Sequence, residues 1–470
     1  MYSKMTRVCI MLLLLTLALL PGIASAQGPT GSFASGIACL NLGTATAQAT
    51  IDFYNTGGTK VANVINPAFE PNKPWLLFTP NISSLGSGFS GSAVVNSAQQ
   101  AACSVNTQTN GGTQRVGTSE GLATTELGPK AYATQIVNAL GNFNSYVSIQ
   151  NAGAASTKVK ARYLNAAGAE VFTQEVDIPA NSSKIFYQEQ AGLPVNFIGS
   201  AIFEATDGTT PLAGAVALYN TATAQLLSFN TVKGGASKVF LPRLAKNLSG
   251  VGYTSGFACQ NIGPGPVDMK MDISMLDQDT KAIVAASLSK AAVGEGQSWL
   301  GFFGSPTGTA IDAINKGFGS GIVTTTSGTG KVACTVNEDN RTVGSNLNGQ
   351  GSTVAGVPDG KQTKKMFFSQ IVALGVNSFR GGFQIANTTA TDTTCTYTFS
   401  NGDVLSNQSL KANSSNSVFA EAVLTNNKTN FNGSVRVECG EAIVGIYNLT
   451  VQGPAAAGDP FATNSGINQQ

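Results

Sequence analysis

The stretch "GFACQNIG", from Gly256 to Gly263, repeats an earlier stretch of the chain, "GIACLNLG", from Gly36 to Gly43. Both stretches are apolar, and in both a cysteine stands two residues before an asparagine. Self-similarity of this kind is the sequence mark of repeat architectures. We therefore looked for further copies of the unit to which the stretch belongs.

Three marks recur four times along the chain, always in the same order. The first is an asparagine that closes an early predicted strand, at intervals of 110, 110 and 126 residues: Asn41, Asn151, Asn261 and Asn387. The second is an aromatic residue shortly before a Gly-Ser or Ser-Gly pair: Phe89, Phe197, Phe318 and Phe431. The third is an asparagine that ends a late predicted strand: Asn106, Asn220, Asn337 and Asn448. This spacing predicts four units, each of a normal size for one compact core.

Between the first two marks, the predicted strands alternate with a period of two. In "VDMKMDI", Val267 to Ile273, apolar residues occupy one face and charged residues the other, as a half-buried antiparallel strand requires. Turn sequences such as "YNTGGT" and "FSNGD" follow these strands and suit hairpins. The predicted fold class is all-β, with four tandem antiparallel β-sandwich domains of immunoglobulin-like type.

The marks also give domain boundaries. After a signal peptide at 1–26, we expect repeats 1 to 4 at 27–110, 131–234, 235–345 and 365–453, with linkers at 111–130 and 346–364 and a flexible tail at 454–470. The polar composition of the two linkers predicts flexibility. Four sandwiches standing in a row are the expected arrangement.

The first 26 residues have the pattern of a secretory signal peptide. A short basic start is followed by an apolar run from Val8 to Leu20 and by the small residues Ala24-Ser25-Ala26, so cleavage is expected before Gln27. The apolar run is too short to span a bilayer. We expect a secreted, extracellular or cell-surface protein with no membrane insertion.

Removal of the signal peptide also removes Cys9 and leaves six cysteines, an even number that predicts three disulfides in an oxidising compartment. Repeats 1 and 3 carry two cysteines each at matching places, and repeat 4 carries its own pair on strand faces that should point inward: Cys39, Cys103, Cys259, Cys334, Cys395 and Cys439. A redox-active thiol is the alternative, but nothing nearby in the sequence would lower a thiol pKa.

Composition narrows the function classes. The chain has no histidine, which removes the commonest general base and the Ser-His and Cys-His nucleophiles. Its net charge is +2, without a basic run, so nucleic acid is not an expected partner. We expect no enzyme activity, no catalytic residues and no cofactor. A hydrolase built on paired carboxylates stays open as a rival.

The segment Val239 to Gly263, "VFLPRLAKNLSGVGYTSGFACQNIG", resembles repeats of exported bacterial surface proteins built of tandem immunoglobulin-like sandwiches. The second repeat resembles them too, in "YVSIQNAGAASTKVKARYLNAAGAEV" and "GLPVNFIGSAIFEA". The resemblance covers most of the chain after residue 26, and its motifs are those of strands and turns. It implies the fold and an extracellular setting, and it brings no catalytic or binding residues.

Three local features have a structural and a functional interpretation. Asp277 and Asp279 could hold calcium, but their place in the repeat is that of a turn, so we expect no metal site. The glycine-rich stretches near Phe89 and Phe318 lack the lysine and helix of a phosphate loop. Trp75 and Trp299 occupy one equivalent place in repeats 1 and 3 and suit a core, with a ligand-binding surface as the alternative.

The favoured function is a non-catalytic structural or adhesive repeat protein of a bacterial cell surface or matrix. Its expected partners are further copies of itself or other surface proteins, because uncovered strand edges in a chain of low charge favour association. Glycans are a further partner class that we consider. The alternative is an array of carbohydrate-binding modules, for which Trp75 and Trp299 would have to be exposed.

Overall fold

The computed structural model describes residues 28–29, 31–71, 73–109, 114–341, 348–373, 379–426, 430–451, 458–459 and 461–468. The predicted signal peptide lies outside these residues. The described chain is all-β, as predicted, with one short α-helix, α2 (Ala420–Val423). Its 3-10 turns are η2 (Thr79–Asn81), η3 (Ser83–Leu85), η4 (Thr124–Glu126), η5 (Gln188–Gln190) and η6 (Ala310–Ala313).

Strands fall into four groups that follow the repeats. Repeat 1 contains β1 (Phe33–Asn41), β2 (Ala47–Asn55), β3 (Lys60–Phe69), β4 (Pro74–Phe78), β5 (Gly91–Ser97), β6 (Ala101–Thr109) and β7 (Gln114–Glu120). Repeat 2 contains β8 (Lys130–Asn138), β9 (Phe143–Asn151), β10 (Thr157–Asn165), β11 (Glu170–Ile178), β12 (Ser183–Tyr187), β13 (Phe197–Ala205), β14 (Leu212–Asn220) and β15 (Leu226–Asn230).

The second half of the chain is organised in the same way. Repeat 3 contains β16 (Lys238–Lys246), β17 (Tyr253–Asn261), β18 (Val267–Asp277), β19 (Ile283–Val293), β20 (Ser298–Phe302), β21 (Gly317–Thr325), β22 (Val332–Asn340), β23 (Gly351–Ala355) and β24 (Val357–Pro358). Repeat 4 and the tail contain β25 (Thr363–Ala373), β26 (Phe379–Asn387), β27 (Thr393–Phe399), β28 (Val404–Leu410), β29 (Ser415–Phe419), β30 (Phe431–Val451), β31 (Gly458–Asp459), β32 (Ala462–Ser465) and β33 (Ile467–Asn468).

Two layers of strands build each repeat. In repeat 2, the sheet β12-β9-β14-β15 faces the sheet β11-β10-β13-β8, and repeat 3 has the same plan in β20-β17-β22-β23 and β19-β18-β21-β16-β24. In repeat 4 the long strand β30 serves both layers, because its first part pairs with β25 and β27 and its second part with β26 and β32. Four large buried apolar clusters lie between the layers, one for each repeat.

The asparagine of the first mark is a buried staple. Asn261 is fully buried, and its Nδ2 donates to the carbonyl oxygens of Gly265 and Val293 at 2.7 and 2.9 Å. Its Oδ1 accepts from the Gly263 amide at 3.0 Å. The same set of bonds surrounds Asn41 and Asn151. One side chain therefore closes a turn and ties it to the end of β3, β11 or β19, which explains why the sequence repeats it.

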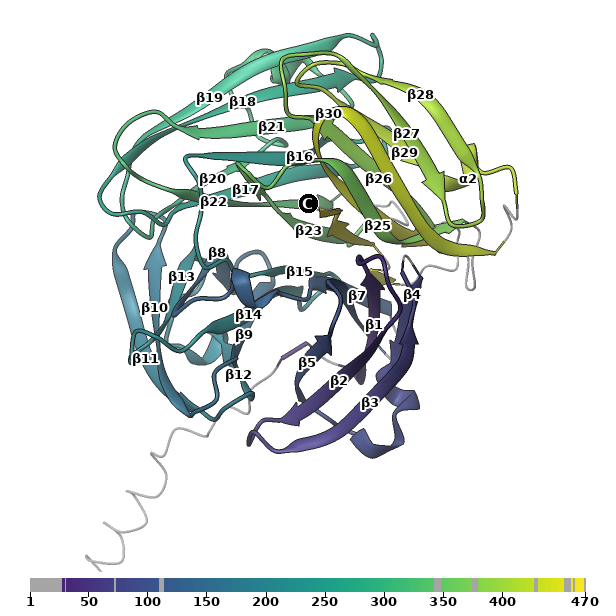
Figure 1. Cartoon of the computed structure of the whole chain (residues 1–470). Helices are drawn as coiled ribbons and strands as arrows, with labels where there is room; N and C mark the ends of the chain where they lie inside the picture. The colour runs from purple at the N-terminus through teal and green to yellow at the C-terminus, as the bar shows by residue number, and fades with distance from the viewer. Residues whose placement is uncertain are drawn as a thin grey trace, which may run out of the picture.

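The sequence predicts four repeats in a row. In the structure they instead follow one another around a closed ring (Figure 1). Repeat 4 contacts repeat 1: Asn106 Nδ2 donates to Gln370 Oε1 at 3.3 Å, and Phe367 packs into a cluster with Leu40 and Leu42. Each repeat thus has two neighbours in the ring. The physical reason is that repeats 1, 3 and 4 each have an apolar or amide-lined outer sheet face that a neighbouring repeat buries, as at Leu40, Gln260 and Gln384.

Segments of the two predicted linkers, 111–130 and 346–364, belong to the sheets, whereas residues 111–113 and 346–347 lie outside the described residues. Residues 114–120 form β7, which pairs antiparallel with β6, and residues 351–355 form β23, which pairs antiparallel with β22. Their polar side chains suggested flexibility, but in the structure both segments are ordered by pairing with a neighbouring strand of their own repeat. β7 and β15 lie side by side at the ring centre, where Ser228 Oγ donates to the Thr118 carbonyl oxygen at 2.8 Å.

The predicted flexible tail is also structured where it is described. β32 pairs with β30, β33 pairs with β25, and β31 pairs in parallel with β7 of repeat 1. The C-terminus therefore ends at the centre of the ring (Figure 1). A small-residue composition favoured a loose tail, whereas β30, β25 and β7 supply the partners that order it.

Candidate functional site

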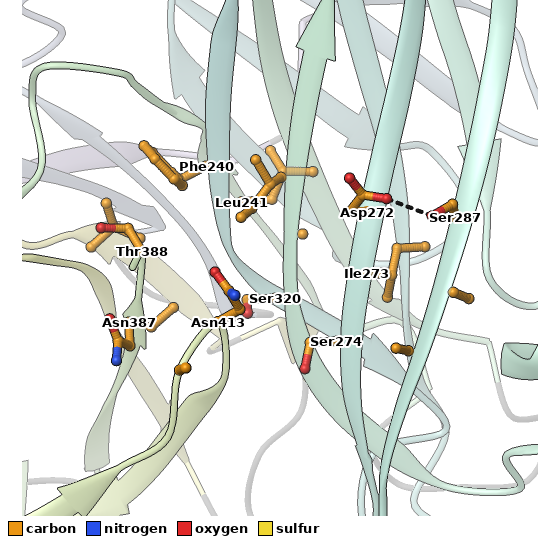
Figure 2. Close-up of a pocket in the computed structure, with 17 residues that line it drawn as sticks. Phe240, Leu241, Asp272, Ile273, Ser274, Ser287, Ser320, Asn387, Thr388 and Asn413 are labelled. Carbon is orange, nitrogen blue, oxygen red and sulfur yellow. Dashed lines mark hydrogen bonds between the residues drawn. The ribbon is translucent and has the colours of Figure 1, made fainter. Parts of the chain in front are cut away.

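A pocket of about 660 Å³ lies at the junction of repeats 3 and 4 (Figure 2). Strands β16, β18, β19 and β21 form one wall, and the other is formed by repeat 4, from β26, β30 and the turns that follow β26 and β28. The residues that line it are Phe240, Leu241, Asp272, Ile273, Ser274, Ala285, Ala286, Ser287, Ser320, Gly321, Ile322, Ala386, Asn387, Thr388, Ala412, Asn413 and Val444. Hydroxyl, amide and small apolar groups thus make up most of the lining.

Asp272 is the carboxylate of this pocket. Its Oδ1 accepts a hydrogen bond from Ser287 Oγ at 2.5 Å and lies 2.8 Å from Lys270 Nζ (Figure 2 shows the serine bond). Burial opposes ionisation of Asp272, but the hydrogen bonds from Lys270 and Ser287 outweigh it and lower its pKa. The carboxylate is therefore held ionised and bonded, which is the opposite of what a general acid needs. The lining suits a neutral polar ligand better than acid-base chemistry.

A buried charge pair of repeat 3 also bonds to repeat 4. Arg243 Nε and Nη2 donate to the two carboxylate oxygens of Glu338 at 2.7 and 2.8 Å, and both side chains are less than a tenth exposed. Arg243 Nη1 donates across the junction to Gln384 Oε1 at 2.9 Å. The Gln384 amide in turn donates to the Pro242 and Gly319 carbonyl oxygens. The bidentate pair holds the Arg243 guanidinium in place within repeat 3, and its remaining donor links repeat 3 to repeat 4.

A second buried charge lies at the ring centre. Asp459 is fully buried, and it accepts from the amides of Leu226 in repeat 2 and Gly351 in repeat 3, each at 3.0 Å. It also pairs in the β ladder with Arg115 of repeat 1. Burial raises the pKa of Asp459 well above its ordinary value, against the lowering effect of the three backbone amides and of Arg115. One tail residue therefore contacts three repeats.

The six predicted cysteines form three disulfides: Cys39–Cys103, Cys259–Cys334 and Cys395–Cys439. Each bridge joins residues directly opposite one another on neighbouring strands of one sheet. The cysteines face the buried clusters. Three such bridges are typical of proteins that fold in an oxidising compartment.

The tryptophans lie in the cores and form no surface platform. Trp299 is 8% exposed and meets Phe257 edge-on, with ring centroids 5.1 Å apart. Trp75 is half-buried and lies 6.0 Å from the Phe69 ring. Each stands opposite the first cysteine of its repeat, in the register Cys39 to Trp75 and Cys259 to Trp299. Their shared place in the repeat is explained by packing over a disulfide.

Asp277 and Asp279 are used by the turn that contains them. Asp277 Oδ1 accepts from the Asp279 amide at 2.9 Å, and this bond lowers the pKa of Asp277. Asp279 pairs with Lys316 at 2.8 Å. Among the residues that the structure describes, no group of three or more acidic or cysteine side chains is placed to hold a metal ion.

Sequence reasoning missed Arg243, Glu338 and Asp459. Arg243 stands between apolar residues in "VFLPRLAK", where an arginine among buried positions signals a paired charge. Asp459 stands in a segment of small residues and carries no comparable signal. In the described parts of the chain, no helix has the length and apolar character needed to cross a membrane.

Comparisons with known proteins add little. No family model matches the chain, and no curated protein matches it. Among solved structures, the chain is similar to Thermotoga maritima 1070, with 16% identity and a TM-score of 0.20 over 22% of this chain and 91% of that one. It is also similar to the serine-rich repeat protein Srr2 of Streptococcus agalactiae, with 12% identity and a TM-score of 0.13 over 55% and 84% of the two chains. Scores this low carry no argument about fold or function.

Proposed function

We propose that this chain is a secreted structural or adhesive protein of a bacterial cell surface or matrix, with no catalytic activity. In this proposal its four repeats are immunoglobulin-like sandwiches that act together as one rigid body. The observation that carries it is the closure of the ring by buried polar contacts between repeats, since such contacts favour a load-bearing scaffold over a hinged enzyme. Arg243, Asp459 and Gln384 form hydrogen bonds in these contacts.

The polar chemistry of the described residues supports a non-catalytic role. Many of the described carboxylates are engaged in ion pairs, as in Lys158–Glu175 and Lys411–Asp392, or accept from backbone amides, as Asp459 does. The chain supplies no histidine as a base. The function that this chemistry favours is therefore binding through the protein surface. Outer strand edges are suited to bind other chains.

The test is the state of the purified, oxidised mature protein in solution. Light scattering over a concentration series, with negative-stain imaging, should show ring-shaped particles that form defined oligomers or bind surface proteins of the producing cell. Particles that stay monomeric at every concentration and bind no cell surface would contradict the proposal. Mass spectrometry of the exported protein should give Gln27 as its first residue.

A carbohydrate-binding role is the second candidate, and the pocket between repeats 3 and 4 is the observation that favours it. Its hydroxyl and amide lining suits sugar hydroxyls. At least one glycan of a panel should then raise the melting temperature of the protein, and the substitution Asn413→Gly should abolish this rise. Glycine suits this position because Asn413 has a positive φ of 50°. A panel without effect on either form would remove this candidate.

A further inference from the structure

In the part of the chain that the structure describes, three of the four junctions in the ring are filled by an extra strand, and the junction between repeats 1 and 2 has no such strand. Repeats 2, 3 and 4 each begin with a lead-in strand, β8, β16 or β25, which pairs with the third strand of the same layer. In repeat 1 that layer has the order β3-β2-β5, so β5 is an edge strand. None of the described residues before Phe33 pairs with β5.

The three lead-in strands share a pattern of four residues: lysine, an apolar residue, an aromatic residue and a second apolar residue. The matching segments are Lys130–Ala133, Lys238–Leu241 and Lys365–Phe368. The first apolar residue lies opposite a core residue of the third strand, in the pairs Ala131–Phe203, Val239–Val323 and Met366–Val437. In each pair, the third-strand residue is fully buried.

The aromatic residue faces the other way, toward the next repeat. Phe240 packs with Ala386 and Val444 of repeat 4, and Phe367 packs with Leu40 and Leu42 of repeat 1. The lysine pairs with an acid of the third strand in two cases, Lys130–Glu204 at 3.0 Å and Lys365–Glu438 at 3.3 Å. A lead-in strand therefore covers its own core with one face and the next repeat with the other.

Between repeats 1 and 2 both of these surfaces are left less covered. Val95, which corresponds to the buried Phe203 and Val323, is only half-buried. On the outer face of repeat 2, Ser148 and Gln150 are half-buried, whereas the corresponding residues of repeats 1, 3 and 4 are at most 5% exposed: Ala38, Leu40, Ala258, Gln260, Gln384 and Ala386. We call the β5 edge and this face of β9, β12 and β14 the seam.

The rim contacts of the seam match those of a filled junction. Ser92 Oγ donates to the Asn181 carbonyl oxygen of repeat 2 at 2.6 Å, as Ser200 Oγ donates to the Gly296 carbonyl oxygen of repeat 3 at 2.6 Å. The two repeats are thus held at this rim as in the filled junction, although no strand among the described residues lies between them there. Tyr146 and Phe33 both pack against the cluster of Ala217, Tyr219 and Leu226 at the far end of the seam. The part that no described strand covers is therefore the stretch beside Ala93–Ser97.

The hydrogen-bonding groups of this stretch can be assigned from the filled junctions. The amides of Ala205 and Thr325 donate to Pro129 and Ser237, which directly precede β8 and β16. Ser97 is the corresponding residue of β5, and in an antiparallel ladder every second residue presents its groups to the same side. The amides and carbonyls of Ala93, Val95 and Ser97 therefore face the open edge.

From this pattern, we propose that the seam binds an extended segment of a partner polypeptide that adds to β5 as an antiparallel strand. The segment carries lysine, an apolar residue, an aromatic residue and an apolar residue in that order, so that its apolar residues cover Val95 and Ala93 and its lysine lies beside Asn96. Edge-strand addition of this kind supplies main-chain hydrogen bonds for affinity and side-chain contacts for specificity. The inference rests on the proposed binding role and names its surface.

The test uses the peptide KAYATQIVN, the sequence of β8, with the mature full-length protein. Fluorescence anisotropy should show saturable binding, and hydrogen exchange should slow at the amides of Ala93, Val95 and Ser97. The same peptide with proline at its fourth position should not bind, because proline removes a ladder donor. Peptide binding without protection of β5 would overturn the proposal.

Two charge variants at an exposed position give a readout that does not depend on folding. Asn96→Glu recreates the acid found at Glu204 and Glu438 and should tighten peptide binding about two- to fivefold, and Asn96→Lys should weaken it by a similar factor. Equal affinities for both variants would contradict the proposed register. A variant with KAYATQIVN and a turn joined ahead of Phe33 should melt at a higher temperature and lose peptide binding.

The outcomes separate this inference from the proposed function. If the whole protein associates or binds cells while the peptide fails to bind, the seam proposal alone is wrong. A concentration-dependent dimer that protects β5 without any peptide binding would replace the partner segment by a second copy of the chain.

Discussion

The guanidinium of Arg243 binds both carboxylate oxygens of Glu338, at 2.7 and 2.8 Å, in a place where neither side chain is more than a tenth exposed. Both residues belong to repeat 3, and the remaining Nη1 of Arg243 reaches Gln384 of repeat 4. The pair therefore couples the stability of one repeat to its docking on the next. Removing one partner would leave a buried charge without compensation.

Arg243→Met should lower the free energy of unfolding by about 3–5 kcal/mol, because it leaves Glu338 buried and unpaired. The double variant Arg243→Met with Glu338→Leu should recover most of this loss, since no charge is then buried. Denaturant unfolding measures both. Lys158→Ala, which breaks an exposed pair with Glu175, is the control and should change stability by less than about 1 kcal/mol. A single variant as mild as this control would contradict the role of the pair.

Asn261→Ala tests the staple that defines the repeat. The substitution leaves the carbonyl oxygens of Gly265 and Val293 and the amide of Gly263 without their partner, so we expect a loss of about 2–4 kcal/mol. Asn63, an exposed asparagine whose Nδ2 donates to Asp52, serves as the matched control, and Asn63→Ala should cost less than about 1 kcal/mol. Similar losses at the two positions would show that burial of the asparagine does not matter.

Replacing Cys39 and Cys103 by alanine should lower the free energy of unfolding by about 4 kcal/mol, because the bridge closes a loop across a sequence separation of 64 residues. The comparison is made by guanidinium unfolding of the oxidised proteins. In reductant, wild type and variant should converge, since the wild-type bridge is then also absent. A gap that persists in reductant would assign the effect to packing instead of the cross-link.

Asp459 should make the free energy of unfolding of the protein decrease as the pH rises. Its pKa is raised on folding, chiefly by burial, so the contribution to stability is complete below the unfolded value near 4 and is lost as pH rises through the raised folded value. Asp459→Asn should remove this pH dependence. It should also cost about 1–3 kcal/mol at low pH, because an amide cannot accept from all three backbone donors. Unfolding curves from pH 4 to 9 decide between these outcomes, and a variant with the wild-type slope would contradict the assignment.

The fold class and the position of the repeats could be predicted because they depend on local patterns. Alternation in Val267–Ile273, the turn after Asn55 and the recurring Asn41 each report structure within a few residues of themselves. The pairing of cysteines in repeats 1 and 3 follows from their matching places in the two repeats. These features need no knowledge of how the repeats meet.

The ring could not be predicted, because its contacts join residues far apart in the chain. Thr118 contacts Thr463, and Asp459 contacts Leu226. The sequence around each of these residues does not indicate which distant residue it contacts. The strands β7, β23 and β32 are short and polar, so their composition suggested linkers and a loose tail. Their order comes from neighbours in other repeats, which a reading of local periodicity does not include.

The central claim is that repeats 1 and 4 meet and close the ring, and small-angle X-ray scattering of the oxidised, monomeric mature protein tests it most directly. A closed ring predicts a radius of gyration near the compact value for a chain of this length, about 22 Å, with a single short maximum dimension. A radius far above that value, with the profile of an elongated rod, would show that the repeats stand in a row and would contradict the ring.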